Sequence, residues 1–155
     1  VVNDNEDISA HRFESRGLLH CVVRLGPRMP DLHCINVHLG LFERGREWQV
    51  RALCERIRQT VPREAPLVIA GDFNDWRHRA NRQLIDQLAV VEVFEAIKGR
   101  PARTFPSVLP LFRLDRIYVR GLDVIDARVH YAYPGRRLSD HAALAATFEL
   151  AAGRR

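Results

Sequence analysis

The chain has 155 residues, 46% of them hydrophobic and 28% charged, so it is long enough to bury a core and too apolar for a disordered protein. No apolar run approaches the ~18 residues of a membrane-spanning helix and no signal peptide is visible at the start, so we expect a soluble globular protein. The formal charge of +5 comes mostly from arginines, which suit an anionic substrate and equally a solvated basic surface. We expect one globular domain over residues 1–155.

Two further features concern the origin of the chain. Its first residue is Val1 and not Met, so either the N-terminus is processed or the chain is a piece of a longer protein. Cys21, Cys34 and Cys54 are odd in number, lack CxxC spacing and lie in apolar segments. This pattern predicts buried, reduced thiols and a cytoplasmic location.

The first half of the chain contains two predicted strands and a helix. Residues 1–14 are polar and predict a loop. Residues 18–25 and 32–39 are β-rich and predict a hairpin around residues 27–31. In the second of these strands alternation puts His38 on the polar face. Residues 45–60 predict a helix, whose buried stripe at i, i+3, i+4, i+7 is formed by Val50, Leu53, Cys54 and Ile57.

The second half alternates strands with loops. Residues 67–70 are wholly apolar and predict a strand buried on both faces, and a helix is expected over 80–88. A proline-containing loop surrounds residues 104–106. The remaining predicted elements are strands at 114–119, 123–131 and 144–150, with a turn at 134–137. The fold class is therefore α/β with strands dominant.

Acidic, amide and imidazole side chains stand at the ends of four predicted strands. His38 ends one strand, Asp72 and Asn74 follow the next, Asp115 begins a third, and residues 139–141 (SDH) precede the last. Enzymes built on sheets place their chemistry at such ends, because the strands fix the side chains and the loops leave room for substrate. These four segments are the candidate site.

Each of these residues also has a simpler interpretation. Asp72 and Asn74 suit an ordinary turn, and a lone histidine such as His38 is more often a surface or satisfied group. Asp115 could form a weak charge pair with a neighbouring strand, and Asp140 could cap a turn. All of these interpretations would have to hold together for the segments to be unrelated.

The segments 36–39 (NVHL), 71–74 (GDFN), 114–117 (LDRI) and 139–141 (SDH) resemble, in this order, the motifs of the endonuclease/exonuclease/phosphatase superfamily. This superfamily includes DNase I, AP endonucleases, sphingomyelinases and inositol polyphosphate phosphatases. The resemblance spans residues 18–150 and implies a DNase I-like four-layer sandwich, two β-sheets flanked by helices. It also implies cleavage of a phosphate ester by water, with Mg²⁺ or Mn²⁺ as the cofactor.

The resemblance assigns roles to single residues. Asp72 would orient and deprotonate the water, and Asn74 would position Asp72 and the phosphate. Asp140 would lie near the metal, and His38 would stabilise the phosphate or the leaving group. These roles match what phosphoester hydrolysis requires, namely an oriented nucleophile and stabilisation of the developing charge.

The resemblance also pairs two residues that are distant in sequence. His141 would bind a phosphoryl oxygen or shuttle a proton, and Asp115 would hold its imidazole in the right tautomer. We therefore expect an Asp115 oxygen within about 3.2 Å of a His141 ring nitrogen. Phe105 is expected in the wall of the same cleft. Arg77, Arg79 and Arg82 could grip a phosphate chain or form a solvated helix face, and the second interpretation is slightly favoured.

One part of the family pattern is missing. Family members carry an Asn on a first strand and a metal-binding Glu upstream of the His38 segment, and neither Glu6 nor Glu14 follows a suitable apolar strand. A whole domain of this type has about 250 residues, more than this chain. We therefore expect the C-terminal portion of such a domain, which by itself binds Mg²⁺ weakly, is inactive, and self-associates or pairs with the missing half.

The substrate stays open at this point. A nucleic acid, a membrane phospholipid and an inositol phosphate share these catalytic motifs, since selection is made in loops. The alternative to an enzyme is a non-catalytic phosphate- or nucleic-acid-binding module, or an inert fragment, because the metal-binding Glu is absent.

Overall fold

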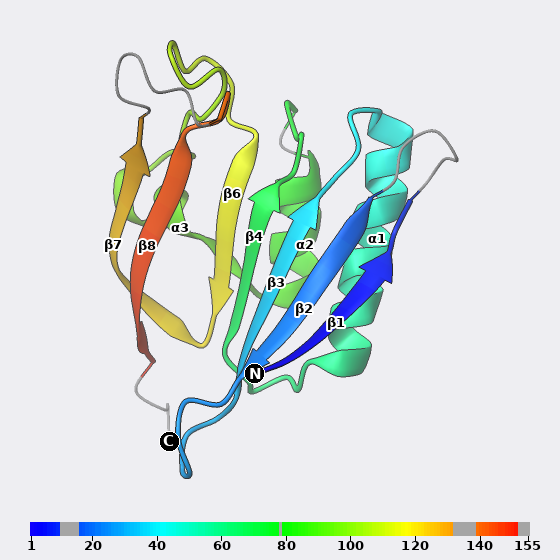
Figure 1. Cartoon of the computed structure of the whole chain (residues 1–155), viewed down its shortest axis with the longest axis vertical. Helices are drawn as coiled ribbons and strands as arrows, with labels where there is room; N and C mark the ends of the chain where they lie inside the picture. The colour runs from blue at the N-terminus through cyan, green and yellow to red at the C-terminus, as the bar shows by residue number, and fades with distance from the viewer. Residues whose placement is uncertain (10–15, 78, 132–138, 152–155) are drawn as a thin grey trace.

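The computed structural model describes residues 1–9, 16–77, 79–131 and 139–151 (Figure 1). Strands and helices follow one another along the chain in the order β1 (Val2–Asp7), β2 (Gly17–Val23), β3 (Leu32–His38), α1 (Glu43–Thr60), β4 (Leu67–Asp72), α2 (Arg79–Leu88), β5 (Val91–Glu92), α3 (Val93–Lys98), β6 (Asp115–Arg120), β7 (Leu122–His130) and β8 (Ala143–Leu150). The chain is thus mixed α/β, as its sequence predicts.

Six strands form one sheet in the order β1-β2-β3-β4-β6-β5, and β7 and β8 form a second, two-stranded sheet. The predicted hairpin of β2 and β3 is confirmed by their antiparallel pairing. β3 and β4 are parallel and joined by α1, whereas β4 and β6 are antiparallel. The C-terminal ends of β3 and β4 therefore meet the N-terminal end of β6 at one edge of the large sheet.

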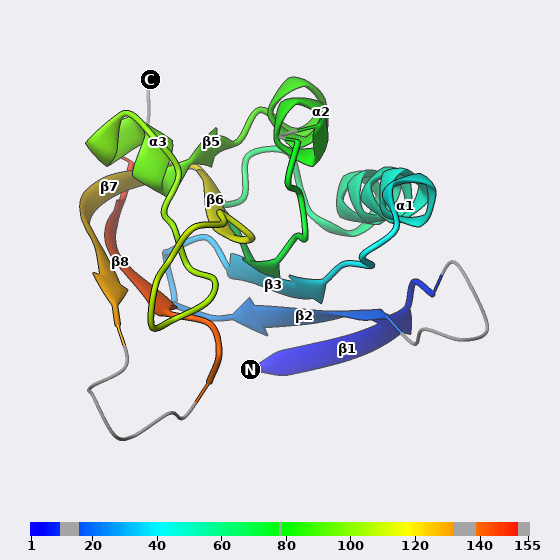
Figure 2. The same cartoon turned by 90° about the horizontal axis from the view of Figure 1, so that it is seen from above.

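Helices α1 and α2 cover one face of the large sheet, which Figure 2 shows from above. The predicted stripe of α1 is confirmed, since Val50, Leu53, Cys54 and Ile57 are all at most 1% exposed. They pack with buried residues of β2, β3 and β4 in a single core cluster. This burial fixes α1, and with it the loop that follows His38.

The opposite face of the large sheet carries a second core. Val119 of β6 and Phe94 of α3 are buried there, and Val68 and Ala70 of β4 pack against them. Residues of β7 and β8 close this core only in part, because Val124, Leu144 and Phe148 are half-buried. The prediction that residues 67–70 are buried on both faces is therefore correct for one face and incomplete for the other.

The N-terminal residues were predicted as a loop, and this was wrong for Val2–Asp7. These residues form an edge strand that pairs antiparallel with β2 over its whole length. Their polar side chains hid the strand, because an edge strand exposes side chains and gains its order from the backbone ladder. Residues 10–14, and with them Glu14, lie outside the described residues.

The short elements β5 and α3 were not predicted from the sequence. The side chain of Glu92 accepts a hydrogen bond from the backbone nitrogen of Glu95 at 2.7 Å, which caps the start of α3. Gly99 ends the helix in the left-handed conformation. An element this short leaves too few residues for a periodic pattern to emerge.

The cysteines follow the prediction in part. All three are free, and Cys54 is buried. Cys21 and Cys34 are half-buried, so the expectation of burial was wrong for these two, which face each other across β2 and β3. No helix in the described part of the chain has the length and apolar character needed to cross a membrane.

Gly71 lets β4 run close beside β3 just before the site. Its φ is +141°, and a Cβ at this position would lie 1.9 Å from the carbonyl oxygen of Val37. Gly71→Ala is therefore expected to lower the free energy of unfolding by more than about 3 kcal/mol, because backbone strain adds to the clash. Urea denaturation of the full-length protein measures this change.

Gly99→Ala is the matched control. Gly99 also has a positive φ, of +71°, but nothing lies within 4 Å of a Cβ there. This substitution should cost about 1–2 kcal/mol, the ordinary penalty of the left-handed conformation. An equal drop in stability in the two variants would show that close approach of β3 and β4 is not the constraint.

Candidate active site

The parallel pairing of β3 and β4 brings His38 beside Asp72. The two residues are direct register partners at the C-terminal ends of their strands. The Nε2 atom of His38 lies 3.5 Å from Oδ2 of Asp72. The Asp72 side chain is 16% exposed and the His38 side chain 58%, so the carboxylate lies at the base and the imidazole on the open side.

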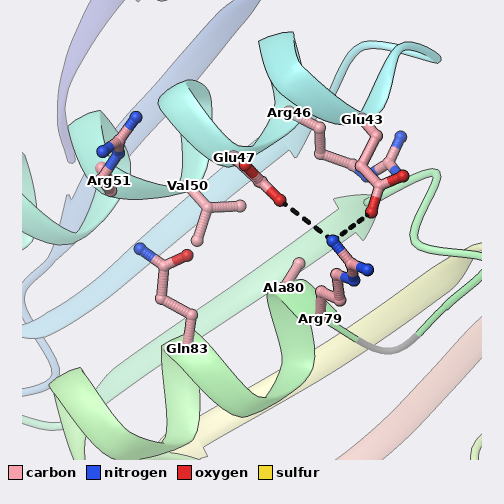
Figure 3. Close-up of a pocket in the computed structure, with 8 residues that line it drawn as sticks. All are labelled: Glu43, Arg46, Glu47, Val50, Arg51, Arg79, Ala80 and Gln83. Atoms are coloured by element: carbon pink, nitrogen blue, oxygen red, sulfur yellow. Dashed lines mark hydrogen bonds and ion pairs between the residues drawn. The ribbon is translucent and has the colours of Figure 1, made fainter.

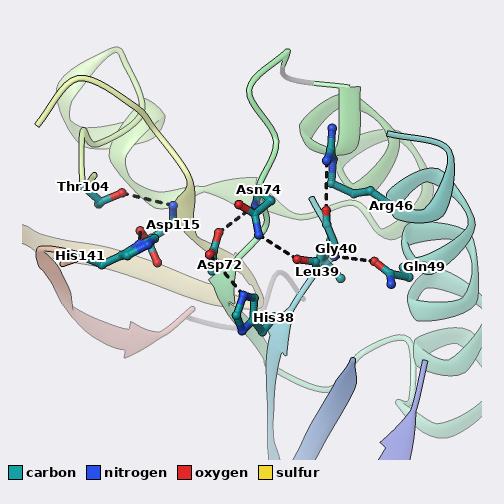
Figure 4. Close-up of polar contacts among 10 residues, drawn as sticks. All are labelled: His38, Leu39, Gly40, Arg46, Gln49, Asp72, Asn74, Thr104, Asp115 and His141. Carbon is teal, nitrogen blue, oxygen red and sulfur yellow. Dashed lines mark hydrogen bonds and ion pairs between the residues drawn. The ribbon is translucent and has the colours of Figure 1, made fainter. Parts of the chain in front are cut away.

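Asn74 fixes the turn that follows Asp72 (Figure 4). Its backbone nitrogen donates a hydrogen bond to Oδ1 of Asp72 at 2.9 Å, and its Nδ2 donates to the carbonyl oxygen of Leu39 at 2.8 Å. The residue is buried and has a φ of +48°. Asn74 thus ties the end of β3 to the turn after β4 and orients the Asp72 carboxylate.

The antiparallel pairing of β4 and β6 places Asp115 directly opposite Asp72. Oδ2 of Asp115 lies 2.7 Å from Nδ1 of His141, within the expected limit of about 3.2 Å. Because Nδ1 faces the carboxylate, Nε2 is the ring nitrogen left for another partner. The ring of Phe105 lies 4.9 Å from the His141 ring.

The loop between α3 and β6 fastens the segment that carries His141. The backbone nitrogen of Ala142 donates to the carbonyl oxygen of Thr104 at 2.8 Å, and that of Ser107 donates to the carbonyl oxygen of Asp140 at 2.7 Å. The hydroxyl of Ser107 donates to the carbonyl oxygen of Ser139 at 2.9 Å. Sequence reasoning missed both roles, since Thr104 and Ser107 act through backbone atoms of a segment remote in sequence.

Burial and neighbouring charges shift two pKa values in the site. Burial raises the pKa of Asp72, the hydrogen bond from Asn74 partly offsets this, and the charge of Asp115 raises it further. Burial lowers the pKa of His141, but the hydrogen bond and charge of Asp115 outweigh it, so the net pKa is raised. Asp72 is thus a better proton acceptor than an exposed aspartate, and His141 holds its proton more firmly than an exposed histidine.

All six predicted site residues line one cleft of about 450 Å³, together with Phe105. The other lining residues were not predicted as site residues; they are Arg16, Leu41, Trp76 and Leu114. Asp140 is exposed at the rim of this cleft. Trp76 packs edge-to-face against Phe112 at 5.1 Å, which builds an aromatic lip.

Two of the arginines that follow Asp75, Arg77 and Arg79, contact α1, and Figure 3 shows Arg79. Arg79 lies between two carboxylates of this helix, with its Nη1 2.6 Å from Glu43 and 3.4 Å from Glu47. Arg77 is paired with Glu43 at 3.1 Å, and Arg82 is exposed. Arg77 and Arg79 are therefore ion-paired at the surface between α1 and α2 and are outside the cleft lining.

The described residues do not form a complete metal site. Across residues 1–9, 16–77, 79–131 and 139–151, no group of three or more His, Cys, Asp or Glu side chains is placed to hold a metal ion. Asp72 and Asp140 line the same cleft, but they offer only part of the six oxygen ligands that Mg²⁺ prefers.

The chain belongs to the Endonuclease/Exonuclease/phosphatase family, whose sequence model matches residues 3–141. Members of this family are hydrolases of phosphate esters and typically depend on a divalent metal. The DNase I-like fold class expected from the motifs is confirmed by the solved structure of an endonuclease/exonuclease/phosphatase from Bacteroides vulgatus, which superposes with a TM-score of 0.79 at 18% identity, over 97% of this chain and 65% of that one.

A curated relative is similar to this chain in sequence, and two further solved structures are similar to it in fold. The uncharacterized protein YbhP of Escherichia coli is 43% identical over 149 residues, which cover 95% of this chain and 58% of YbhP. The chain therefore spans little more than half the length of this relative. The mannosyl-6-phosphatase of Bacteroides thetaiotaomicron superposes with a TM-score of 0.79 at 17% identity, over 97% of this chain and 66% of that one. D. rerio TDP2, solved with a single-strand DNA product, superposes with a TM-score of 0.77 at 20% identity, over 96% of this chain and 67% of that one.

Proposed function

We propose that the full-length protein hydrolyses a phosphate ester by attack of water, with the described cleft as its active site. The observation that carries the proposal is the convergence of Asp72, His38 and the Asp115–His141 pair in one cleft, from four separate segments (Figure 4). A half-buried carboxylate with a raised pKa beside a carboxylate-oriented imidazole is the arrangement that acid–base chemistry requires.

In this proposal Asp72, His141 and His38 have separate catalytic roles. Asp72 accepts a proton from the attacking water, because its raised pKa makes it a stronger base and Asn74 holds it in place. His141 donates a hydrogen bond or a proton from Nε2 to a phosphoryl oxygen, and Asp115 keeps its Nδ1 protonated. His38, on the open side of Asp72, stabilises the phosphate or the leaving group.

We propose Mg²⁺ or Mn²⁺ as the cofactor of the full-length protein, with Asp140 as one ligand. A divalent cation would supply positive charge against the oxygens of the reacting phosphate. The remaining ligands would have to come from outside the described residues, because these hold no cluster of three metal-binding side chains. A cytoplasmic location stays a prediction.

A second candidate function is a phosphate-binding module without catalysis, and the incomplete metal site favours it. One assay separates the two. Full-length protein is incubated with bis(p-nitrophenyl) phosphate and Mn²⁺, then with EDTA, then with Mn²⁺ again. The proposal expects turnover that chelation abolishes and metal restores. Absence of turnover, with phosphate still bound, would favour the binding module.

A further inference from the structure

A second cavity, outside the cleft, lies between α3, β7 and the loop that precedes β6. It has a volume of about 470 Å³. Phe94, Ala127 and Val129 are among its lining residues and give it an apolar floor. α3 and β7 are in contact, and Figure 1 shows them beside each other at the edge of the molecule. None of the proposed catalytic residues lines this cavity.

Four cationic side chains line this cavity: Lys98, Arg100, Arg103 and Arg113. No acidic residue is among the lining residues, and within the described part of the chain none of the four forms an ion pair. Arg113 is half-buried, and its Nε has no hydrogen-bond partner among the described residues. A buried guanidinium nitrogen without a partner favours an anionic ligand, because leaving it unsatisfied is costly.

The same loop joins this cavity to the cleft. Residues 104–105 and 112 run side by side, held by hydrogen bonds from the backbone nitrogens of Thr104 and Phe105 to the carbonyl oxygen of Phe112. Residues close together in these two segments line different cavities. Arg103 lines the cationic cavity and Phe105 the cleft, while Arg113 lines the cationic cavity and Leu114 the cleft.

We propose that the cationic cavity binds a further phosphate group of the substrate, and that the substrate is a single-stranded nucleic acid. This inference rests on the proposed function and adds the substrate class. A flexible single strand can bend around the loop that separates the two cavities, whereas duplex DNA stays stiff over ~50 nm. A concave cavity also fits a phosphodiester chain better than the flat surface of a membrane.

Aromatic side chains support the choice of nucleic acid. Tyr131, at the end of β7, lines the cationic cavity and is 55% exposed. Trp76 and Phe112 are 45% and 42% exposed at the lip of the cleft. Cationic grooves with exposed aromatic rings are typical of single-strand binding, because phosphates pair with the cations and bases stack on the rings.

Arg100→Gln/Arg103→Gln in the full-length protein tests this assignment. Binding of a fluorescein-labelled oligothymidylate, within the ~4–16 nucleotides that single-strand binding folds cover, is measured by anisotropy in EDTA at several salt concentrations. We expect affinity to fall about tenfold or more. The slope of log K against log salt concentration should become shallower by about 1.4, because each phosphate that an arginine no longer neutralises removes ~0.7 from the slope.

Arg24→Gln/Arg28→Gln is the matched control, since it removes the same charge from the exposed loop between β2 and β3, at the opposite end of the sheet from His38. It should leave the salt dependence unchanged. An equal fall in affinity in both double variants would overturn the proposal, because net charge alone would then explain binding.

Two further measurements distinguish a nucleic acid from a lipid ligand and test catalysis separately from binding. Anionic phospholipid vesicles are tested in the same way, and binding to vesicles in place of the oligonucleotide would overturn the proposal. Hydrolysis of bis(p-nitrophenyl) phosphate by the unsubstituted protein reports on the proposed function alone. Absence of hydrolysis together with cavity-dependent oligonucleotide binding would contradict the catalytic proposal and leave the binding assignment intact.

Discussion

Asp72→Asn in the full-length protein should lower the turnover of a phosphodiester about a hundredfold or more, roughly 2.7 kcal/mol of transition-state stabilisation. Asparagine keeps the size of the side chain and can still accept the 2.9 Å hydrogen bond from the Asn74 nitrogen. It cannot accept a proton from water, so the proposed base is removed. Initial rates on bis(p-nitrophenyl) phosphate, together with the urea midpoint, separate catalysis from folding.

Asp86→Asn makes the same chemical change on the exposed surface of α2 and should leave turnover unaltered. His141→Ala is the companion variant, because it removes the partner of Asp115 and should lower turnover by a similar factor. Near-normal activity in both Asp72→Asn and His141→Ala would remove the basis for the proposed site.

The second large effect concerns chain length. Residues 1–155 alone should be essentially inactive and bind Mg²⁺ weakly, whereas the full-length protein should hydrolyse the phosphate ester. Asp72, Asp140 and the nearby Asn74 are the ligands that we expect among the described residues for a hard cation, which leaves most of its ligand positions to water. Both forms are assayed side by side with Mn²⁺ on bis(p-nitrophenyl) phosphate.

The same chain should also self-associate, or bind the rest of the protein when this is supplied. β8 pairs with β7 on one side only, and Leu144 and Phe148 are half-buried on the face that packs toward the second core. Open strand edges and exposed apolar faces favour association. Light scattering measures it. A monomeric 155-residue chain with the turnover of the full-length protein would show that another acidic residue, such as Glu14 outside the described residues, completes the metal site.

The polar ends of the strands were predictable because two rules act together. Alternation within a strand put His38 on the polar face, and a buried apolar run followed by Gly71 and Asp72 marked the end of β4. The register of the strands then brings these residues together, because the pairing of β3, β4 and β6 places His38, Asp72 and Asp115 side by side. The short distance between Asp115 and His141 was expected from the family resemblance and not from spacing.

The hydrogen bonds that support the site residues could not be predicted by such rules. Thr104 and Ser107 hold the segment around His141 through backbone carbonyls, and Arg46 bonds the carbonyl oxygens of Gly40 and Leu41 from a buried position on α1. No residue type is required at the accepting end of such a bond, so the sequence leaves no signal of it. The cationic cavity was not predicted either. Its arginines, Arg100, Arg103 and Arg113, come together only when the loop before β6 folds back on itself beside β7.

Hydrolysis in ¹⁸O-labelled water tests the central claim most directly. The full-length protein turns over a phosphate ester with Mn²⁺, and mass spectrometry locates the label in the products. If water activated by Asp72 attacks phosphorus, one ¹⁸O atom enters the phosphate product of each hydrolysis and none enters the released alcohol. Label in the alcohol, or no product at all from any phosphate ester tested, would contradict this account.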